Sequence, residues 1–88
     1  MVQATVEKKV NDALTARLRE GRADLETLPN GHVCGHVISP EFEGLSYQDR
    51  YRRINEILER ELNQDELIQV STLLTYTPKE WEFEPEHN

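Results

Sequence analysis

The apolar residues of this chain keep two different spacings, and the places where the spacing changes restrict the fold more than any other feature. From residue 2 to residue 20 an apolar residue recurs at every fourth position, which places one apolar stripe along one side of a helix. The members of this stripe are Val2, Val6, Val10, Leu14 and Leu18. Gly21 is predicted to end the helix, because glycine adopts the left-handed backbone conformation that is common just after helix ends.

A β-hairpin is predicted to follow this helix. Residues 24–28 alternate polar and apolar side chains, and residues 32–39 supply the return strand. Between them lie Asn30 and Gly31, the pair most typical of a two-residue hairpin turn, since both residues accept a positive φ. Pro40 is expected to end the return strand because proline has no backbone N–H to donate to a sheet.

The four-residue spacing returns in a second helix that begins after Ser46. The serine hydroxyl is expected to cap the helix, and the apolar stripe consists of Tyr47, Tyr51, Ile54, Ile57, Leu58 and Leu62. Residues 63–65 are predicted to break this helix, and residues 68–76, rich in β-branched side chains, are predicted to form a third strand. Pro78 should end that strand, and Trp81 and Phe83 should fold back onto the core.

The predicted order is therefore helix, strand, strand, helix, strand, which indicates an α+β fold with a three-stranded sheet packed on helices. The length of 88 residues favours one domain, predicted over residues 1–83, and residues 84–88 are predicted to be a disordered acidic tail.

Composition restricts the function further. Seventeen Asp and Glu outnumber ten Lys and Arg, and the resulting net charge of -7 disfavours nucleic acid as a partner unless the basic residues cluster. Cys34 is the single cysteine, so no intrachain disulfide can form. The sequence contains neither a membrane-spanning run nor the apolar core of a signal peptide, so a cytoplasmic location is expected. No nucleophile, base and orienting group can be identified, so an enzyme is not predicted.

Two short runs carry a resemblance to a known family. Residues 42–46 read Phe-Glu-Gly-Leu-Ser, and residues 76–81 read Tyr-Thr-Pro-Lys-Glu-Trp. Residues 30–32, Asn-Gly-His, match the hairpin loop that precedes these runs in the same family. With the predicted helix and strand between the two runs, the chain resembles the BolA-like proteins over roughly residues 6–82.

The resemblance implies a fold of the class II KH type and a partnership with a monothiol glutaredoxin. Members of the family share a [2Fe-2S] cluster with that partner or bind it without a cluster, and they act in iron–sulfur and redox homeostasis. Some members are linked to transcriptional control. The chain is thus expected to be an adaptor that binds no cofactor alone, and to be a monomer or a weak homodimer.

A residue that the resemblance implies as a ligand is replaced here. The family nearly always has a histidine just before the last strand as its main cluster ligand, and counting back from Trp81 places Gln69 at that position. A neutral amide is a poor ligand for iron. His32 falls at the position of the second family ligand, a loop histidine or cysteine.

His32, Cys34 and His36 are the candidate metal ligands. In a regular strand their side chains project from one face, with neighbouring members about 7 Å apart along the strand, so a His-x-Cys or Cys-x-His pair could chelate one metal. The alternative is a polar strand face on which Cys34 is half-buried as a small apolar residue.

Arg50, Arg52, Arg53 and Lys79 are the candidates for a surface that contacts a partner or nucleic acid. The alternative is a solvated helix face with ion pairs along the helix. A nucleic-acid-binding transcriptional regulator that uses the helix from Arg50 to Arg60 is the alternative function. The chain contains no Gly-x-x-Gly, the loop with which KH domains grip RNA.

Overall fold

A computed structural model of the chain describes residues 5–83. The first predicted helical positions and the predicted tail over residues 84–88 lie outside the described residues. The elements in chain order are α1 (Val6–Arg17), β1 (Arg22–Thr27), β2 (Val33–Ile38), a 3₁₀ turn (Pro40–Phe42), α2 (Tyr47–Glu61), α3 (Gln64–Gln69), β3 (Val70–Tyr76) and α4 (Pro78–Phe83).

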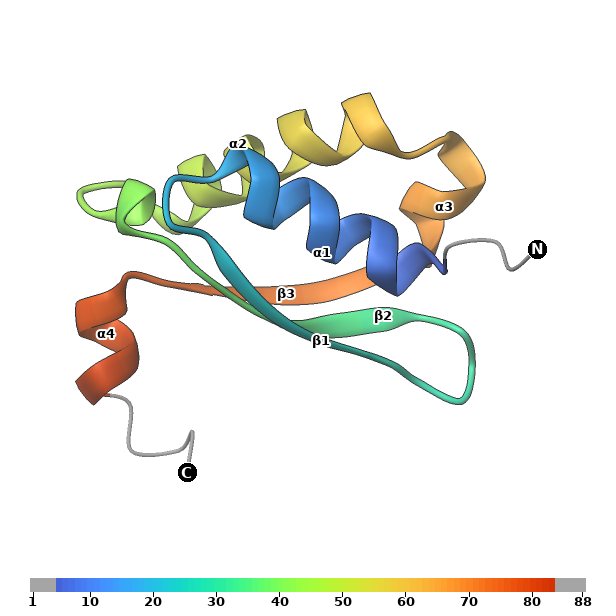
Figure 1. The fold of residues 1–88 in the computed structure, drawn as a ribbon, viewed down its shortest axis with the longest axis horizontal. Helices are drawn as coiled ribbons and strands as arrows, with labels where there is room; N and C mark the ends of the chain where they lie inside the picture. Colours follow the sequence, from blue (N-terminus) through green and yellow to red (C-terminus); the bar gives the residue numbers. More distant parts are fainter. Residues whose placement is uncertain (1–4, 84–88) are drawn as a thin grey trace.

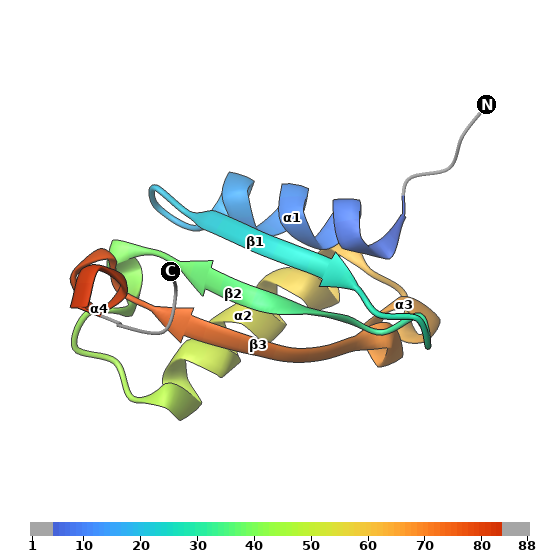
Figure 2. The ribbon, with the colours of Figure 1, turned by 90° about the horizontal axis from the view of Figure 1, so that it is seen from below.

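The three strands form one mixed sheet in the order β1-β2-β3. β1 and β2 are antiparallel, whereas β2 and β3 are parallel. Helices α1 and α2 lie side by side on one face of the sheet (Figures 1 and 2), and the opposite face carries no long helix within residues 5–83. This arrangement confirms the predicted α+β class and the three-stranded sheet.

The core lies between the two long helices and the sheet. Most of the predicted stripe residues are buried there, and the least exposed side chains of the core are Val10, Leu14, Val37, Phe42, Ile54 and Leu58. The prediction was wrong at the start of α2, where Tyr47 and Tyr51 are 67% and 38% exposed. The buried stripe runs instead through Arg50, which lies four residues before Ile54.

The end of α1 differs from the prediction. The helix ends at Arg17, and Leu18 turns into the core with 3% exposure while its N–H still bonds to the Leu14 carbonyl at 2.9 Å. The residue with a positive φ is Glu20, at 47°, and not Gly21. Gly21 is required for space, because a Cβ there would lie 2.8 Å from the Leu18 Cβ.

The hairpin forms as predicted, but its turn is wider than two residues. Residues 28–32 connect the strands, and only Gly31 among them has a positive φ, at 89°. The Leu28 N–H donates to the His32 carbonyl at 2.7 Å, and the His32 N–H donates to the Asn30 side chain at 3.1 Å. His32 therefore lies in the loop, before β2 begins at Val33.

The turn between β2 and α2 is anchored in the core. Phe42 is fully buried in the core, and Gly44 has a φ of 80°. Ser46 caps α2, with its hydroxyl accepting from the Asp49 N–H at 3.2 Å. These contacts orient α2 across the sheet.

α2 ends at Glu61, and residues 63–65 begin a further short helix where the sequence predicts a break followed by a strand. Asn63 accepts from the Glu66 N–H at 2.9 Å, and the Glu66 carboxylate accepts from the Asn63 N–H at 3.0 Å, a capping box. Gln69 is consequently the last residue of α3, and β3 begins at Val70.

Asn63→Ala is expected to destabilise the domain by about 1 kcal/mol, because the substitution leaves the first N–H groups of α3 without a side-chain acceptor. A urea titration followed by circular dichroism measures this loss. Gln64→Ala, one residue later on an exposed position, is the control and should change stability little. An equal effect of the two variants would contradict the capping role of Asn63.

Helix α4 begins at Pro78 and does not fold back onto the core. Trp81 lies against the side of the sheet that α1 and α2 leave open, where it contacts His36 and Tyr76, and Phe83 is 75% exposed. The expected packing of Trp81 and Phe83 on the main core was therefore wrong. None of the helices in the described part of the chain is long and apolar enough to cross a membrane.

Candidate functional site

The end of the sheet that holds the hairpin loop also holds the junction between α3 and β3. Val33 and Val70 are paired in the parallel register of β2 and β3. The residues that precede them, His32 and Gln69, therefore lie at the same end of the sheet. The fold thus brings to one end of the sheet the two positions that the resemblance implies as ligands, although they are far apart in the sequence.

His32 and Gln69 differ in how accessible their side chains are to a metal ion. The His32 side chain is exposed on the loop. Gln69 is half-buried, and its amide nitrogen donates to the Asp65 carbonyl at 3.4 Å, a long hydrogen bond within α3. His32 is thus the more accessible donor of the two, and the only imidazole at this end of the sheet in the described residues.

Cys34 and His36 share the outer face of β2, as predicted, but His32 does not belong to that strand. Cys34 lies opposite Glu26, with Sγ 3.9 Å from the carboxylate oxygen, and its side chain is half-buried. His36 lies opposite Asp24, with Nε2 3.9 Å from the Asp24 carboxylate. The three predicted ligands thus divide into a loop residue and a pair on the strand.

The His36 ring is occupied by aromatic contacts. It stacks on Trp81 with centroids 4.3 Å apart and an interplanar angle of 25°, and Tyr76 meets it edge to face at 6.2 Å. These contacts join α4 to the outer face of the sheet. Within residues 5–83, no three or more His, Cys, Asp or Glu side chains converge in a way that would hold a metal ion.

Arg50, one of the four predicted surface cations, is buried. Its side chain is 6% exposed and binds the Glu80 carboxylate through two hydrogen bonds of 2.8 and 3.1 Å. It also donates to the backbone carbonyls of Leu45 and Thr75 at 3.1 and 3.3 Å. Arg50 therefore does not lie on a partner surface, but connects α2, β3 and α4.

Arg50 also affects the acid chemistry of its partner. Its hydrogen bonds to the Glu80 carboxylate lower the pKa of Glu80 from the ordinary value of 4.5, and a hydrogen bond from the Thr77 N–H acts in the same direction against the effect of burial. The Arg50 guanidinium further lies 5.1 Å from the Tyr47 ring centroid and 5.8 Å from that of Phe42.

The other predicted basic residues stay on the surface. Arg52 is 71% exposed and pairs with Asp49 at 3.3 Å. Arg53 donates to Glu41 and to the Arg17 carbonyl, each at 3.3 Å. Lys79 is exposed at the start of α4. These three side chains do not form one cluster with Arg50.

Sequence reasoning missed Glu80, although its spacing from Thr77 carries a signal. The Glu80 N–H donates to the Thr77 hydroxyl at 3.1 Å, and the Thr77 N–H donates to the Glu80 carboxylate at 2.8 Å. A threonine followed three residues later by glutamate is the sequence signature of such a capping box. The burial of Arg50 carries no comparable signal, because an arginine four residues before Ile54 does not stand out as part of an apolar stripe.

Known proteins resemble this chain in their three-dimensional structures. The sequence matches no family model, and no curated protein matches it. Among solved structures, BolA1 from Arabidopsis thaliana superposes with a TM-score of 0.72 at 20% identity, covering 89% of this chain and 98% of that one. The BolA domain of SufE1 from Arabidopsis thaliana gives 0.69 at 22% identity, with 90% and 99% covered.

A bolA protein homologue from Coxiella burnetii is 28% identical, with a TM-score of 0.65 and coverage of 93% of this chain and 99% of the homologue. The similarity spans nearly the whole of each solved chain, so it concerns the complete fold and not a shared fragment. The predicted resemblance is therefore confirmed at the level of the fold, and the chain has a BolA-like fold.

Proposed function

We propose that this chain is a BolA-type adaptor that binds a monothiol glutaredoxin and acts in iron–sulfur cluster and redox homeostasis. The observation that carries the proposal is the place of His32, an exposed imidazole on the hairpin loop of a BolA fold, at the end of the sheet that also holds Gln69. An adaptor requires an accessible metal ligand of this kind, and it does not require a nucleophile and a base.

The donors of this chain fit a [2Fe-2S] cluster only as a shared group. Such a cluster is held by four ligands, Cys or His. The described residues offer His32 at the loop and Cys34 two residues further on, while His36 is stacked against Trp81. His32, with Cys34 as the second candidate, would therefore be the contribution of this chain, and the partner would supply the other ligands.

Replacing His32 with alanine is expected to weaken formation of the cluster-bound complex at least about tenfold, since even the loss of a residue that supports a metal ligand costs that much. Gln69→His should strengthen the complex, because imidazole is a better iron ligand than a neutral amide. The measurement is a titration of each variant into a cluster-loaded monothiol glutaredoxin, followed by visible absorbance and circular dichroism.

The control is His36→Asn, which removes an imidazole of the same chain that lies in the aromatic contacts. This variant should keep the spectral change. If His32→Ala keeps it as well, His32 is not a ligand. If calorimetry detects binding without a spectral change, the adaptor binds its partner without a cluster, and if no binding occurs the proposal fails.

The nucleic-acid alternative gains no support from the site. Arg50 is buried, Arg53 is bound to Glu41 and to a carbonyl, and Arg52 is paired with Asp49. Phosphate binding depends on cations that are free to replace counterions, and the net charge of -7 opposes it further.

A further inference from the structure

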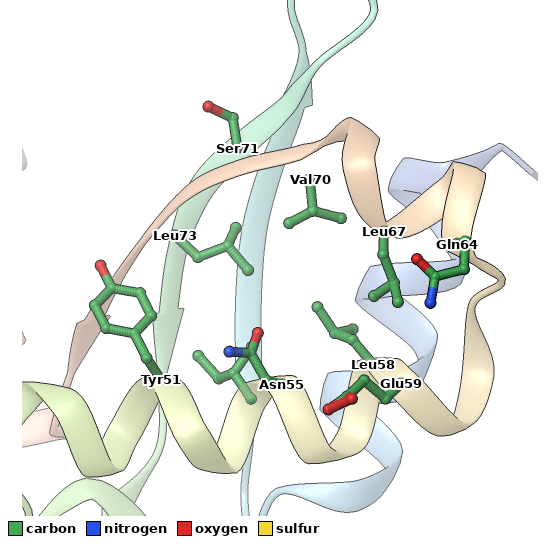
Figure 3. Close-up of a pocket in the computed structure, with 10 residues that line it drawn as sticks. Tyr51, Asn55, Leu58, Glu59, Gln64, Leu67, Val70, Ser71 and Leu73 are labelled. Carbon is green, nitrogen blue, oxygen red and sulfur yellow. The ribbon is translucent and has the colours of Figure 1, made fainter.

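A groove opens between α2, α3 and β3 (Figure 3). Its volume is about 420 Å³, within the range of about 300–1,000 Å³ in which proteins bind ligands. Leu58 from α2 and Leu73 from β3 point toward each other across it, and Leu67 and Val70 close it on the side of α3. The floor of the groove is therefore apolar.

An irregularity in β3 produces this floor. Val33 pairs with Val70 but Gly35 pairs with Leu73, so β3 has one more residue than β2 over the same stretch. In a regular strand Val70 and Leu73 would face opposite sides of the sheet. The β-bulge turns both side chains into the groove, an effect that bulges often have near binding sites.

The groove also runs along an unpaired edge of the sheet. Among residues 5–83, β3 pairs with β2 alone, so its other side carries backbone groups without a strand partner. In Figure 3 this edge of β3 lies in front of β2 and β1. At the end of β3 toward α4, the Arg50 side chain already donates a hydrogen bond to the Thr75 carbonyl. A short extended segment can therefore add to β3 between the bulge and Thr75.

The rim of the groove selects for positive charge. Glu59 is the only charged residue that lines it, and within the described residues Glu59 forms no ion pair. The neighbouring side chains of Asn55 and Gln64 likewise make no hydrogen bond in the described part of the chain. An occupant with a cation next to an apolar group would complement both the rim and the floor.

We propose that this groove binds a short extended segment of a partner protein in which a large aliphatic or aromatic side chain stands next to a lysine or arginine. The apolar side chain packs on the half-buried Leu67 and Val70, next to the buried Leu58 and Leu73. The cation pairs with Glu59, and the backbone of the segment bonds to the free edge of β3. This site goes beyond the proposed glutaredoxin function and does not use His32.

The test uses the full chain and capped hexapeptides with Phe-Arg or Leu-Lys at the centre, compared with the same peptides carrying Glu in place of the cation. Amide chemical shifts from nitrogen-15 spectra report the site. The basic peptides are expected to shift Asn55, Ser71 and Leu73, and the acidic peptides are expected to leave them unchanged. Binding should weaken as salt is added.

Two variants locate the interaction. Glu59→Gln should weaken binding of the basic peptides about two- to fivefold, the range of an exposed ion pair. Glu56→Gln, three residues earlier on the same helix, exposed and outside this groove, is the matched control and should have no effect. Asn55→Trp fills the groove from an exposed position and should abolish binding, and its melting curve shows whether the fold is intact.

Other outcomes would overturn the proposal. These are shifts that map outside the groove, equal binding of the acidic peptides, equal effects of Glu59→Gln and Glu56→Gln, or no shift with any basic peptide. Shifts of the same residues that depend on protein concentration without peptide would show that a second copy of the chain occupies the groove. His32→Ala should leave peptide binding unchanged, which separates this test from that of the glutaredoxin proposal.

Discussion

Gly35→Ala is expected to destabilise the domain by at least about 3 kcal/mol. The residue lies in the middle of β2 with a φ of 148°, and a Cβ there would lie 2.1 Å from the Asp24 carbonyl oxygen and 2.9 Å from the Leu25 Cα. Both atoms belong to the backbone of β1, so they can move only if the two strands separate. A strained φ costs about 1–3 kcal/mol and overpacking adds a similar amount.

The stability lost in Gly35→Ala is a large part of the total free energy of unfolding. The free energy of unfolding expected for a domain of 88 residues is about 4–13 kcal/mol. Guanidinium unfolding monitored by Trp81 fluorescence measures the change. Because Gly35 separates Cys34 from His36, the same variant should also weaken the contacts of His36 with Trp81.

Gly31→Ala is the matched control for this prediction. Gly31 also has a positive φ, 89°, but a Cβ there would meet no described atom within 4 Å. Its cost is expected to be about 1–2 kcal/mol, that of a left-handed backbone alone. Similar losses in the two variants would mean that the close approach of β1 is not what requires glycine at position 35.

Glu80→Gln is expected to destabilise the domain by about 2 kcal/mol at neutral pH. The new amide would keep a carbonyl acceptor for Arg50 but would leave the buried guanidinium without a counter-charge, and breaking one side of a buried ion pair is costly. The cost is smaller than for a fully buried pair, because the Glu80 side chain is 43% exposed. Thermal unfolding at pH 7 measures the difference.

The pH dependence identifies the charge as the cause. The pKa of Glu80 is lowered in the folded state, mainly by the hydrogen bonds from Arg50, so its contribution is complete above the unfolded value of 4.5. The contribution is lost as the pH falls through the lowered folded-state pKa. Wild type and Glu80→Gln should therefore converge in stability in strong acid, while differing fully near pH 7.

Two further groups test this interpretation. The pKa of Glu66 is also lowered, first by a hydrogen bond from Lys9, but Glu66 is present in both proteins and cancels in the difference. Glu82→Gln, an exposed residue of the same helix, is the control and should match wild type at every pH. A stability difference between wild type and Glu80→Gln that stays constant down to strong acid would contradict the ion pair as its source.

The sequence predicted the parts of the fold that depend on periodicity. Val10, Leu14, Ile54 and Leu58 have exposures of at most 1%, as their spacing required. The spacing misplaced the tyrosines of α2, because an arginine on the buried face has no apolar signature. Arg50 can be buried only because Glu80 and two backbone carbonyls receive its donors, and those contacts come largely from distant parts of the chain.

The candidate site was predictable in its residues and less so in its arrangement. The single cysteine and the histidines at positions 32 and 36 are visible in the sequence. Whether they share a face depends on where β2 begins, and the loop hydrogen bonds of Leu28 and Asn30 place that point after His32. The short helix α3 was missed because residues 63–65, interpreted as a break after the long helix, contain Asn63, the cap of the next helix.

β2 pairs with β1 through a short hairpin, whereas it pairs with β3 only after two more helices. We therefore expect the two halves of the sheet end that holds His32 and Gln69 to form at different stages of folding. The hairpin can close early, whereas the parallel pairing requires closure of the long segment that contains α2 and α3. A partner that touches both residues thus binds only the completed native state. Its binding would stabilise the domain in proportion to the logarithm of its concentration.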